Sequence, residues 1–172
     1  MPTFLIVGAT GKQGGKAIST LLDHQAKNKD LSLRFITRNP DSSSAKKLVD
    51  QGAQAIKADL FDKESLRQAL TGVDRAFLVT DAMAGEEKET QQGKLFIDVA
   101  KEVGVKHIVF TSVSAADTAN TVPHFRSKYQ VRVHLVSLAQ ADIQVEKHLH
   151  VSGLTYTILR PVAFMVGLPF KD

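Results

Sequence analysis

The chain has 172 residues, with 22 basic and 18 acidic side chains, a formal net charge of +4 and no cysteine. This length predicts one domain with a hydrophobic core, and the lack of cysteine excludes disulfides and thiolate metal sites. Because no lysine or arginine run concentrates the charge, we expect no direct contact with nucleic acid. The first residues carry no basic leader and only a short apolar run. We therefore expect no export signal, no membrane partner and a cytoplasmic location, with the nucleus as an alternative.

The chain opens with an apolar run that is followed by regularly spaced glycines. Residues 4–7 are all apolar, as in a strand buried on both faces, and apolar residues at helical spacing begin at Ala17. A glycine turn between a strand and a helix lets backbone N–H groups and the positive helix end approach a pyrophosphate. We therefore predict dinucleotide binding there. The residues assigned to this site are Gly8, Thr10, Gly11, Lys12, Gln13 and Gly14. For Lys12, a solvated loop lysine is the alternative.

Strand and helix patterns alternate along the rest of the chain. Strands are expected at residues 4–7, 31–37, 53–58, 75–80, 107–111 and 156–159, with helices between them. The clearest helix ends at Gly104 and carries an apolar stripe made of Leu95, Phe96, Val99, Ala100 and Val103. This alternation predicts an α/β fold with a doubly wound parallel sheet and the strand order 3-2-1-4-5-6.

The end of the second predicted strand indicates which dinucleotide is bound. An acidic residue at this place accepts hydrogen bonds from the ribose 2′-hydroxyl of NAD, but here Thr37 is followed by Arg38. A guanidinium forms two charge-assisted hydrogen bonds with a 2′-phosphate and offers a hydroxyl little. We therefore expect NADP(H) to be preferred over NAD(H), with Arg38 at the phosphate. The alternative is that Arg38 is a surface residue.

Further polar residues follow the third and fourth predicted strands. Asp59 either accepts a hydrogen bond from the adenine amino group or caps the helix expected at residues 62–70. Thr80 closes the fourth strand and by its position should line the dinucleotide crevice. Residues 86–89 (Glu-Glu-Lys-Glu) begin a long helix, and we assign them to solvent because acids complement the helix dipole there.

Several motifs resemble those of the NmrA-like family of atypical short-chain dehydrogenases/reductases. These motifs are the glycine turn, T-R-N-P, Q-G-K-L-F-I-D-V-A-K, H-I-V-F-T-S-V-S, V-E-K-H-L and L-T-Y-T-I-L-R-P-V-A-F-M. The resemblance implies a Rossmann fold over residues 1–165 that binds NADP(H), and it adds Pro161 to the cofactor-binding residues. Members of the family range from redox-sensing regulators to reductases of quinones and similar carbonyl compounds.

The catalytic residues of the wider superfamily match this chain only in part. Its enzymes use a tyrosine four residues before a lysine, together with a serine after the fifth strand. Lys128 matches the lysine, which also holds the nicotinamide ribose, and Ser112 or Ser114 matches the serine. His124 stands where the tyrosine is expected, and Tyr129 is turned about 100° around the helix from that place. This departure puts reductase chemistry in doubt and leaves cofactor binding intact.

Two segments depart from the family pattern. Residues 131–144 are an atypical insertion, and the pattern stops after Met165, which leaves 166–172 as an atypical tail without the C-terminal substrate region. The codons permitted at both places include splice signals, so translated introns are one hypothesis, and a natural insertion with a short tail is the other. The insertion either extends a helix by about 21 Å or loops out. An uncovered sixth strand would favour homodimerisation or marginal stability.

Three functions follow from these patterns. The first is a redox-responsive regulator that binds NADP(H) and a protein partner. The second is an NADPH-dependent reductase of quinones or other carbonyl compounds, and the third is a truncated product without a function. The scattered histidines predict no metal site.

Overall fold

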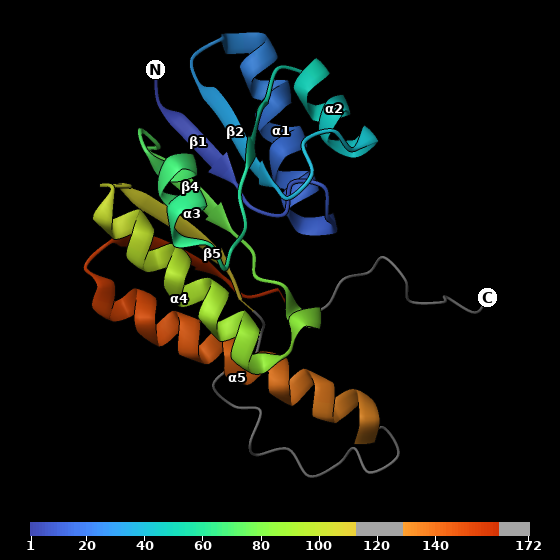
Figure 1. The fold of residues 1–172 in the computed structure, drawn as a ribbon, viewed down its shortest axis with the longest axis vertical. Coiled ribbons are helices and arrows are strands. Elements are labelled where there is room, and N and C mark those ends of the chain that lie inside the picture. The colour runs from blue at the N-terminus through green and yellow to red at the C-terminus, as the bar shows by residue number, and fades with distance from the viewer. Residues whose placement is uncertain (113–128, 162–172) are drawn as a thin grey trace, which may run out of the picture.

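The computed structural model describes the backbone of residues 1–112 and 129–161, and the side chains of residues 1–81, 83–112 and 141–161. Strands and helices alternate as the sequence predicted, and Figure 1 shows their arrangement. The elements are β1 (Thr3–Ile6), α1 (Lys12–Asn28), β2 (Ser32–Thr37), α2 (Ser43–Asp50), β3 (Gln54–Lys57), α3 (Lys63–Leu70), β4 (Arg75–Leu78), the short 3-10 helix η1 (Ala82–Ala84), α4 (Glu86–Glu102), β5 (His107–Thr111), α5 (Tyr129–Ser152) and β6 (Thr155–Leu159).

The six strands form one parallel sheet in the order β3-β2-β1-β4-β5-β6. This order confirms the predicted doubly wound α/β fold. The register places Phe4 beside Leu33 of β2 and Arg75 of β4, so β1 lies at the centre of the sheet. All strands run in the same direction, and their carboxyl ends therefore meet at one edge. In this architecture, ligands bind at that edge.

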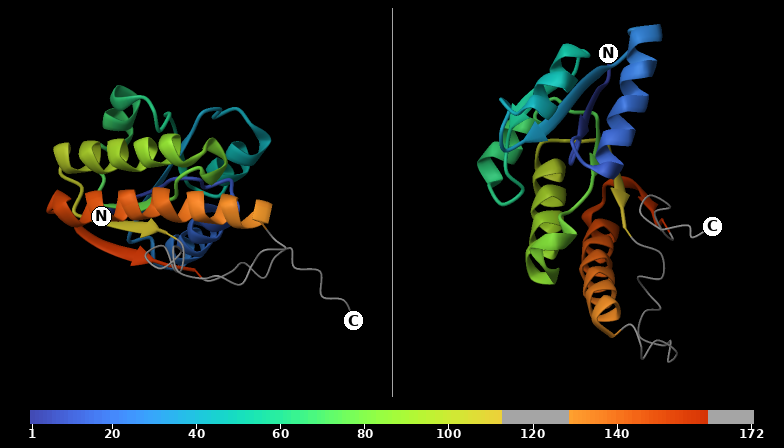
Figure 2. Two further views of the ribbon diagram at one scale, coloured as in Figure 1. Left: turned by 90° about the horizontal axis from the view of Figure 1, so that it is seen from below. Right: turned by 90° about the vertical axis from the view of Figure 1, so that its right-hand side faces the viewer.

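Helices cover the two faces of the sheet, and Figure 2 shows α1 and α4 on opposite sides. On the first face, Ile18 and Leu22 of α1 pack with Leu33 and Phe35 of β2. The core on the second face joins α3, α4 and α5 to the sheet, with Phe96 and Phe110 fully buried. The burial of alternate strand residues on both faces explains why the strands read as nearly continuous apolar runs.

The helices α4 and α5 approach each other closely at a glycine. A Cβ atom at Gly93 would lie 2.4 Å from Cγ2 of Val145, which is closer than two carbon atoms can pack. Residues 131–144 belong to the continuous helix α5, so they extend a helix, which is the first of the two expected arrangements. The helix α4 ends at Glu102, and Gly104, which follows its C-cap Val103, has a φ of 82°, in the left-handed region that a glycine after a helix adopts.

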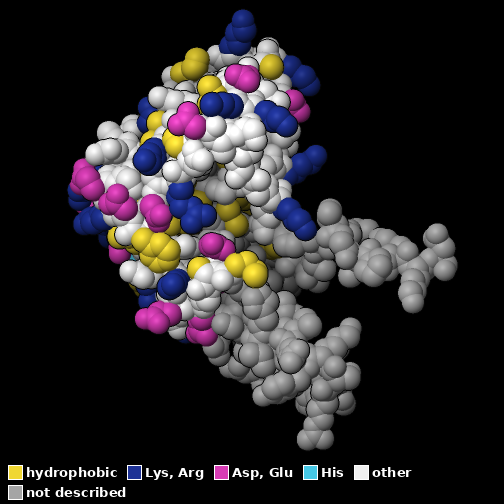
Figure 3. All heavy atoms as spheres, turned by 45° about the vertical axis from the view of Figure 1, so that its right-hand side comes forward, with side chains coloured by type: hydrophobic (Ala, Val, Ile, Leu, Met, Phe, Trp, Pro, Cys, Tyr) yellow, Lys and Arg dark blue, Asp and Glu magenta, His cyan; other side chains and the backbone are white. Residues whose placement is uncertain are grey.

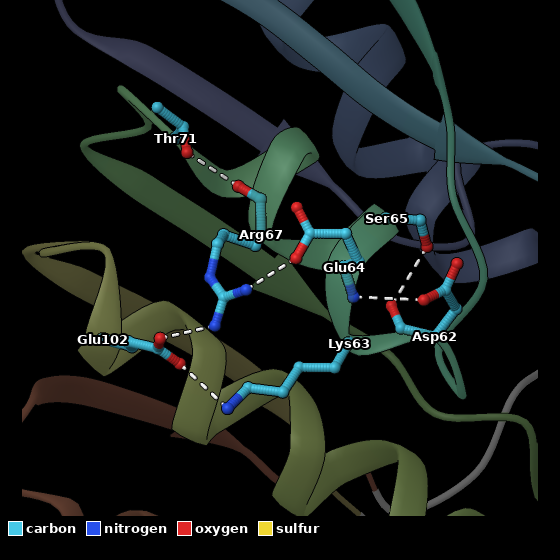
Figure 4. Close-up of polar contacts among 7 residues, drawn as sticks. All are labelled: Asp62, Lys63, Glu64, Ser65, Arg67, Thr71 and Glu102. Atoms are coloured by element: carbon cyan, nitrogen blue, oxygen red, sulfur yellow. Dashed lines mark hydrogen bonds and ion pairs between the residues drawn. The ribbon is translucent and has the colours of Figure 1, made fainter.

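An ion-pair cluster connects α3 and α4 on the outer surface (Figure 4). The guanidinium of Arg67 contacts Glu102 of α4 at 2.5 Å and Glu64 of its own helix at 2.6 Å, and Lys63 contacts Glu102 at 3.2 Å. Hydrogen bonds from Arg67 and then Lys63 lower the pKa of Glu102 below its ordinary value. These contacts fix the start of α3, which Asp62 caps by accepting the Glu64 N–H at 3.0 Å.

None of the helices in the described part of the chain combines the length and the apolar composition that a membrane crossing requires.

Candidate functional site

The glycine turn lies between β1 and α1, at the carboxyl edge of the sheet. Gly8 has a φ of 66°, in the left-handed region that favours glycine, and accepts the Gly11 N–H at 2.8 Å. A Cβ atom at Gly14 would lie 2.4 Å from the carbonyl oxygen of Gly8, so only glycine permits this close approach. Gly11 is the N-cap of α1, and no described side chain caps the helix. The first-turn N–H groups are thus suited to bind an anion such as a pyrophosphate.

The neighbouring residues of the turn differ in burial and in contacts. Thr10 and Lys12 are exposed, and Lys12 is the first residue of α1. The carbonyl oxygen of the Gln13 side chain accepts a hydrogen bond from the hydroxyl of Thr111, the last residue of β5. This bond connects the start of α1 with the carboxyl end of β5. The residues predicted for the pyrophosphate therefore share one turn, and one of them is held by a distant strand.

Arg38 follows β2, which pairs directly with β1. The arginine and the glycine turn therefore lie at the same edge of the sheet. Arg38 lines a cavity of about 320 Å³ together with Lys57, Ala58, Asp59, Asp62 and Ser65. Figure 3 shows basic side chains spread over the end of the molecule that carries α1 and α2, with acidic and apolar side chains among them.

Asp59 stands in the loop between β3 and α3 and lines this cavity. Its Oδ1 accepts the backbone N–H of Phe61 at 2.9 Å, and its own N–H donates to the hydroxyl of Ser65 at 3.1 Å. The cap of α3 is Asp62, so the alternative assignment of Asp59 as the cap is wrong. The helix begins three residues later than a cap at Asp59 would require.

The end of β4 is held by buried side chains of α4. Glu89 is only 3% exposed and accepts a hydrogen bond from the hydroxyl of Thr80 at 2.7 Å. The side-chain oxygen of Gln92, also buried, accepts the Asp81 N–H at 3.0 Å. The assignment of Glu89 to solvent is therefore wrong, because the first turn of α4 faces the end of β4. Thr80 itself lies at the predicted edge, half-buried.

A second group of buried acids lies where α5 meets the ends of β5 and β6. Glu146 is 4% exposed and pairs with Arg160, whose Nε donates to Oε1 at 3.0 Å. Burial raises the pKa of Glu146, but the hydrogen bonds and charge of Arg160, with the nearby Ser112 hydroxyl, lower it further than burial raises it. Burial, with the charges of Glu89 and Glu146, raises the pKa of Asp142 to about 8. At neutral pH this region thus holds a protonated carboxyl beside two other acids.

Ser112 follows β5 and is 5% exposed, with its N–H bonded to the carbonyl oxygen of Leu159 at 2.8 Å. Pro161 comes directly after Arg160 at the carboxyl end of β6. Lys128, His124 and the alternative Ser114 lie outside the described residues. Of the predicted catalytic residues, Ser112 is the one that the structure describes.

Lys57 is a cavity residue that the sequence alone did not indicate. It is the last residue of β3 and pairs in register with Thr37, the residue before Arg38. The only sequence signal was a lysine two residues before Asp59, which by itself does not indicate which strand lies beside β3.

Comparison with known proteins places this geometry in a family. The profile of the NmrA-like family matches residues 2–167. An NmrA-like family domain-containing protein of Dictyostelium discoideum is 34% identical over 145 residues, which cover 80% of this chain and 46% of that protein. Quinone oxidoreductase 2 of Escherichia coli is 33% identical over 155 residues, covering 90% of this chain and 46% of the enzyme.

A crystal structure of an NADPH-dependent quinone oxidoreductase from Escherichia coli, in complex with NADPH, superposes with a TM-score of 0.70 and 32% identity. The superposition covers 91% of this chain and 48% of that one. The chain thus spans about half the length of these relatives. From its matched residues, its sheet order and its glycine turn, the chain belongs to the NmrA-like family, an NAD(P)-binding family with oxidoreductase members.

Proposed function

We propose that this chain binds NADP(H), with the pyrophosphate at the first turn of α1 and the 2′-phosphate at Arg38. The observation that carries the proposal is the close approach of Gly14 to Gly8, which brings the start of α1 against the end of β1, with no described side chain capping the helix. Arg38 at the same edge supplies the charge for the phosphate, and Asp59 in the same cavity supplies an acceptor for the adenine amino group. The relative solved with NADPH supports the choice of ligand.

Within this proposal, the chain acts as a redox-responsive regulator whose bound dinucleotide is sensed by a protein partner. The support comes from the sequence, in which histidine stands at position 124 where the enzymes of the superfamily have tyrosine. A site that retains the phosphate-binding residues without the usual proton donor would hold the dinucleotide without turnover, and the nicotinamide ring, the only part that differs between NADP⁺ and NADPH, would carry the signal.

The second candidate is an NADPH-dependent reductase of quinones or other carbonyl compounds. The 33% identity to quinone oxidoreductase 2 favours it, together with the buried Ser112 at the end of β5. When bound, NADPH would supply the hydride. Ser112 would then polarise the carbonyl oxygen, and Lys128 would orient the nicotinamide ribose.

Calorimetric titration with NADPH, NADP⁺, NADH and NAD⁺, followed by NADPH oxidation with a panel of quinones, separates these candidates. Tight binding without turnover selects the regulator, turnover selects the reductase, and no binding of any dinucleotide contradicts both. Arg38→Ala should remove the preference for the phosphorylated dinucleotides. Arg75→Ala is the matched control, because it removes the same charge from the start of β4, at the opposite edge of the sheet.

A further inference from the structure

The cavity beside Arg38 holds a second cation, on the neighbouring strand. Ala58 donates its N–H to the carbonyl oxygen of Thr37 at 3.1 Å, so the segments carrying Arg38 and Lys57 continue side by side past the end of the sheet ladder. Both side chains are exposed and line the same cavity. Among the described residues, neither forms an ion pair with a carboxylate.

The two carboxylates of the cavity lie in the loop between β3 and α3. Asp59 and Asp62 each direct one oxygen to a backbone N–H, of Phe61 at 2.9 Å and of Glu64 at 3.0 Å. These bonds hold both carboxylates against the backbone of their own segment. Among the described residues, neither carboxylate forms an ion pair with Arg38 or Lys57. The cavity therefore has cations at the ends of β2 and β3 and acceptors at the start of α3.

This distribution of charge is complementary to an adenosine that carries a phosphate on its ribose. The phosphate is a dianion that two cations neutralise better than one, and the adenine amino group is a donor that a carboxylate accepts. Free phosphate would satisfy the cations but would leave the two carboxylates without a donor.

Resting on the proposed binding of NADP(H), we infer that Lys57 is a second cation for the 2′-phosphate, so that the ends of β2 and β3 together determine the preference over NAD(H). Lys57 acts as a compact charge, while Arg38 supplies the planar pair of donors. The glycine turn contacts the pyrophosphate that both dinucleotides share and contributes equally to the binding of each.

The test compares the dissociation constants of NADPH and NADH for Lys57→Gln, Arg38→Gln, the double variant and Lys57→Arg. We expect Lys57→Gln to weaken NADPH binding about tenfold, the usual effect of losing one hydrogen bond to a charged group, and to leave NADH binding unchanged. Lys57→Arg should retain most of the preference. The control is Lys101→Gln, which removes a lysine from the last turn of α4, outside the cavity.

Two further measurements identify the ligand. Adenosine 2′,5′-bisphosphate should lose affinity with Lys57→Gln as NADPH does, whereas adenosine 5′-monophosphate should not. Inorganic phosphate should compete only weakly, and strong competition by it would mean that the cations bind free phosphate.

The outcomes separate this inference from the proposal on which it rests. If the wild-type chain binds NADPH tightly and Lys57→Gln weakens NADPH and NADH equally or leaves both unchanged, then the inference is wrong and the proposed function stands. If the folded wild-type chain binds neither dinucleotide, then both are wrong. Thermal melting of each variant shows whether a loss of binding reflects a loss of fold.

Discussion

Among the described residues, Asp142 is the titratable group whose replacement should change the stability most clearly. Its side chain belongs to α5 and is 6% exposed, and burial, followed by the charges of Glu89 and Glu146, raises its pKa from 3.8 to about 8. Asparagine has nearly the same shape as a protonated aspartate but carries no titrating proton. The substitution Asp142→Asn therefore removes the ionisation and retains the packing.

The sign and size of the effect follow from proton linkage. In the unfolded chain this carboxyl loses its proton above pH 3.8, whereas in the folded chain it keeps the proton up to about pH 8. Across this window the folded state binds more protons, so the stability of the wild type falls as the pH rises and levels off above pH 8. At about 1.4 kcal/mol for each pH unit, the cost reaches about 2 kcal/mol at pH 5 and about 4 kcal/mol at pH 7.

The measurement is urea unfolding of the wild type and Asp142→Asn at a series of pH values. The free energy of unfolding of the variant, minus that of the wild type, should grow from pH 5 to pH 8 and then remain constant. Asp23→Asn is the control, because it makes the same change of side chain at an exposed position on α1. A difference for Asp142→Asn that is also independent of pH would refute the argument from burial.

Three other substitutions test the glycine turn, the packing of α4 on α5, and the ion-pair cluster. Gly14→Ala places a methyl group against the Gly8 carbonyl oxygen and should abolish tight NADPH binding, with a lower melting temperature, whereas unchanged affinity would contradict the close-approach argument. Gly93→Ala inserts a methyl group against Val145 and should cost about 1–3 kcal/mol of unfolding free energy, a cost that Gly93→Ala combined with Val145→Ala should largely remove. Glu102→Gln removes the negative charge that pairs with both Arg67 and Lys63. It should lower the melting temperature at low salt and have less effect at high salt, because salt screens ion pairs at the surface. An equal effect at both salt concentrations would argue against an ionic contribution.

Local sequence was sufficient to predict the first unit of the fold. The apolar strand, the glycine turn ending at Gly14 and the helix that follows are contiguous, and the requirements of each are visible within about twenty residues. The strand order was predictable as well, because strands and helices alternate and few sheet topologies accommodate that alternation.

Features that depend on contacts between distant elements were not visible in the sequence. Glu89 reads as a solvated acid in a charged helix start, and its burial depends on the position of Thr80 beneath α4. Lys57 is brought beside Arg38 by the register of β3 on β2, across a separation in sequence that contains all of α2. An acid at the start of a helix and a lysine at the end of a strand are both common on protein surfaces. Only the residue beside each in the folded structure, Thr80 for Glu89 and Arg38 for Lys57, indicates what it does.

The bond between Gln13 and Thr111 joins residues 98 positions apart in the chain. Through this bond, the start of α1 is held in part by β5, a strand that is synthesised much later than α1. An N-terminal fragment that ends before β5 would contain every glycine of the glycine turn but would lack the hydroxyl that bonds to Gln13. The contacts around the first turn of α1 are thus complete only when the second half of the sheet is present.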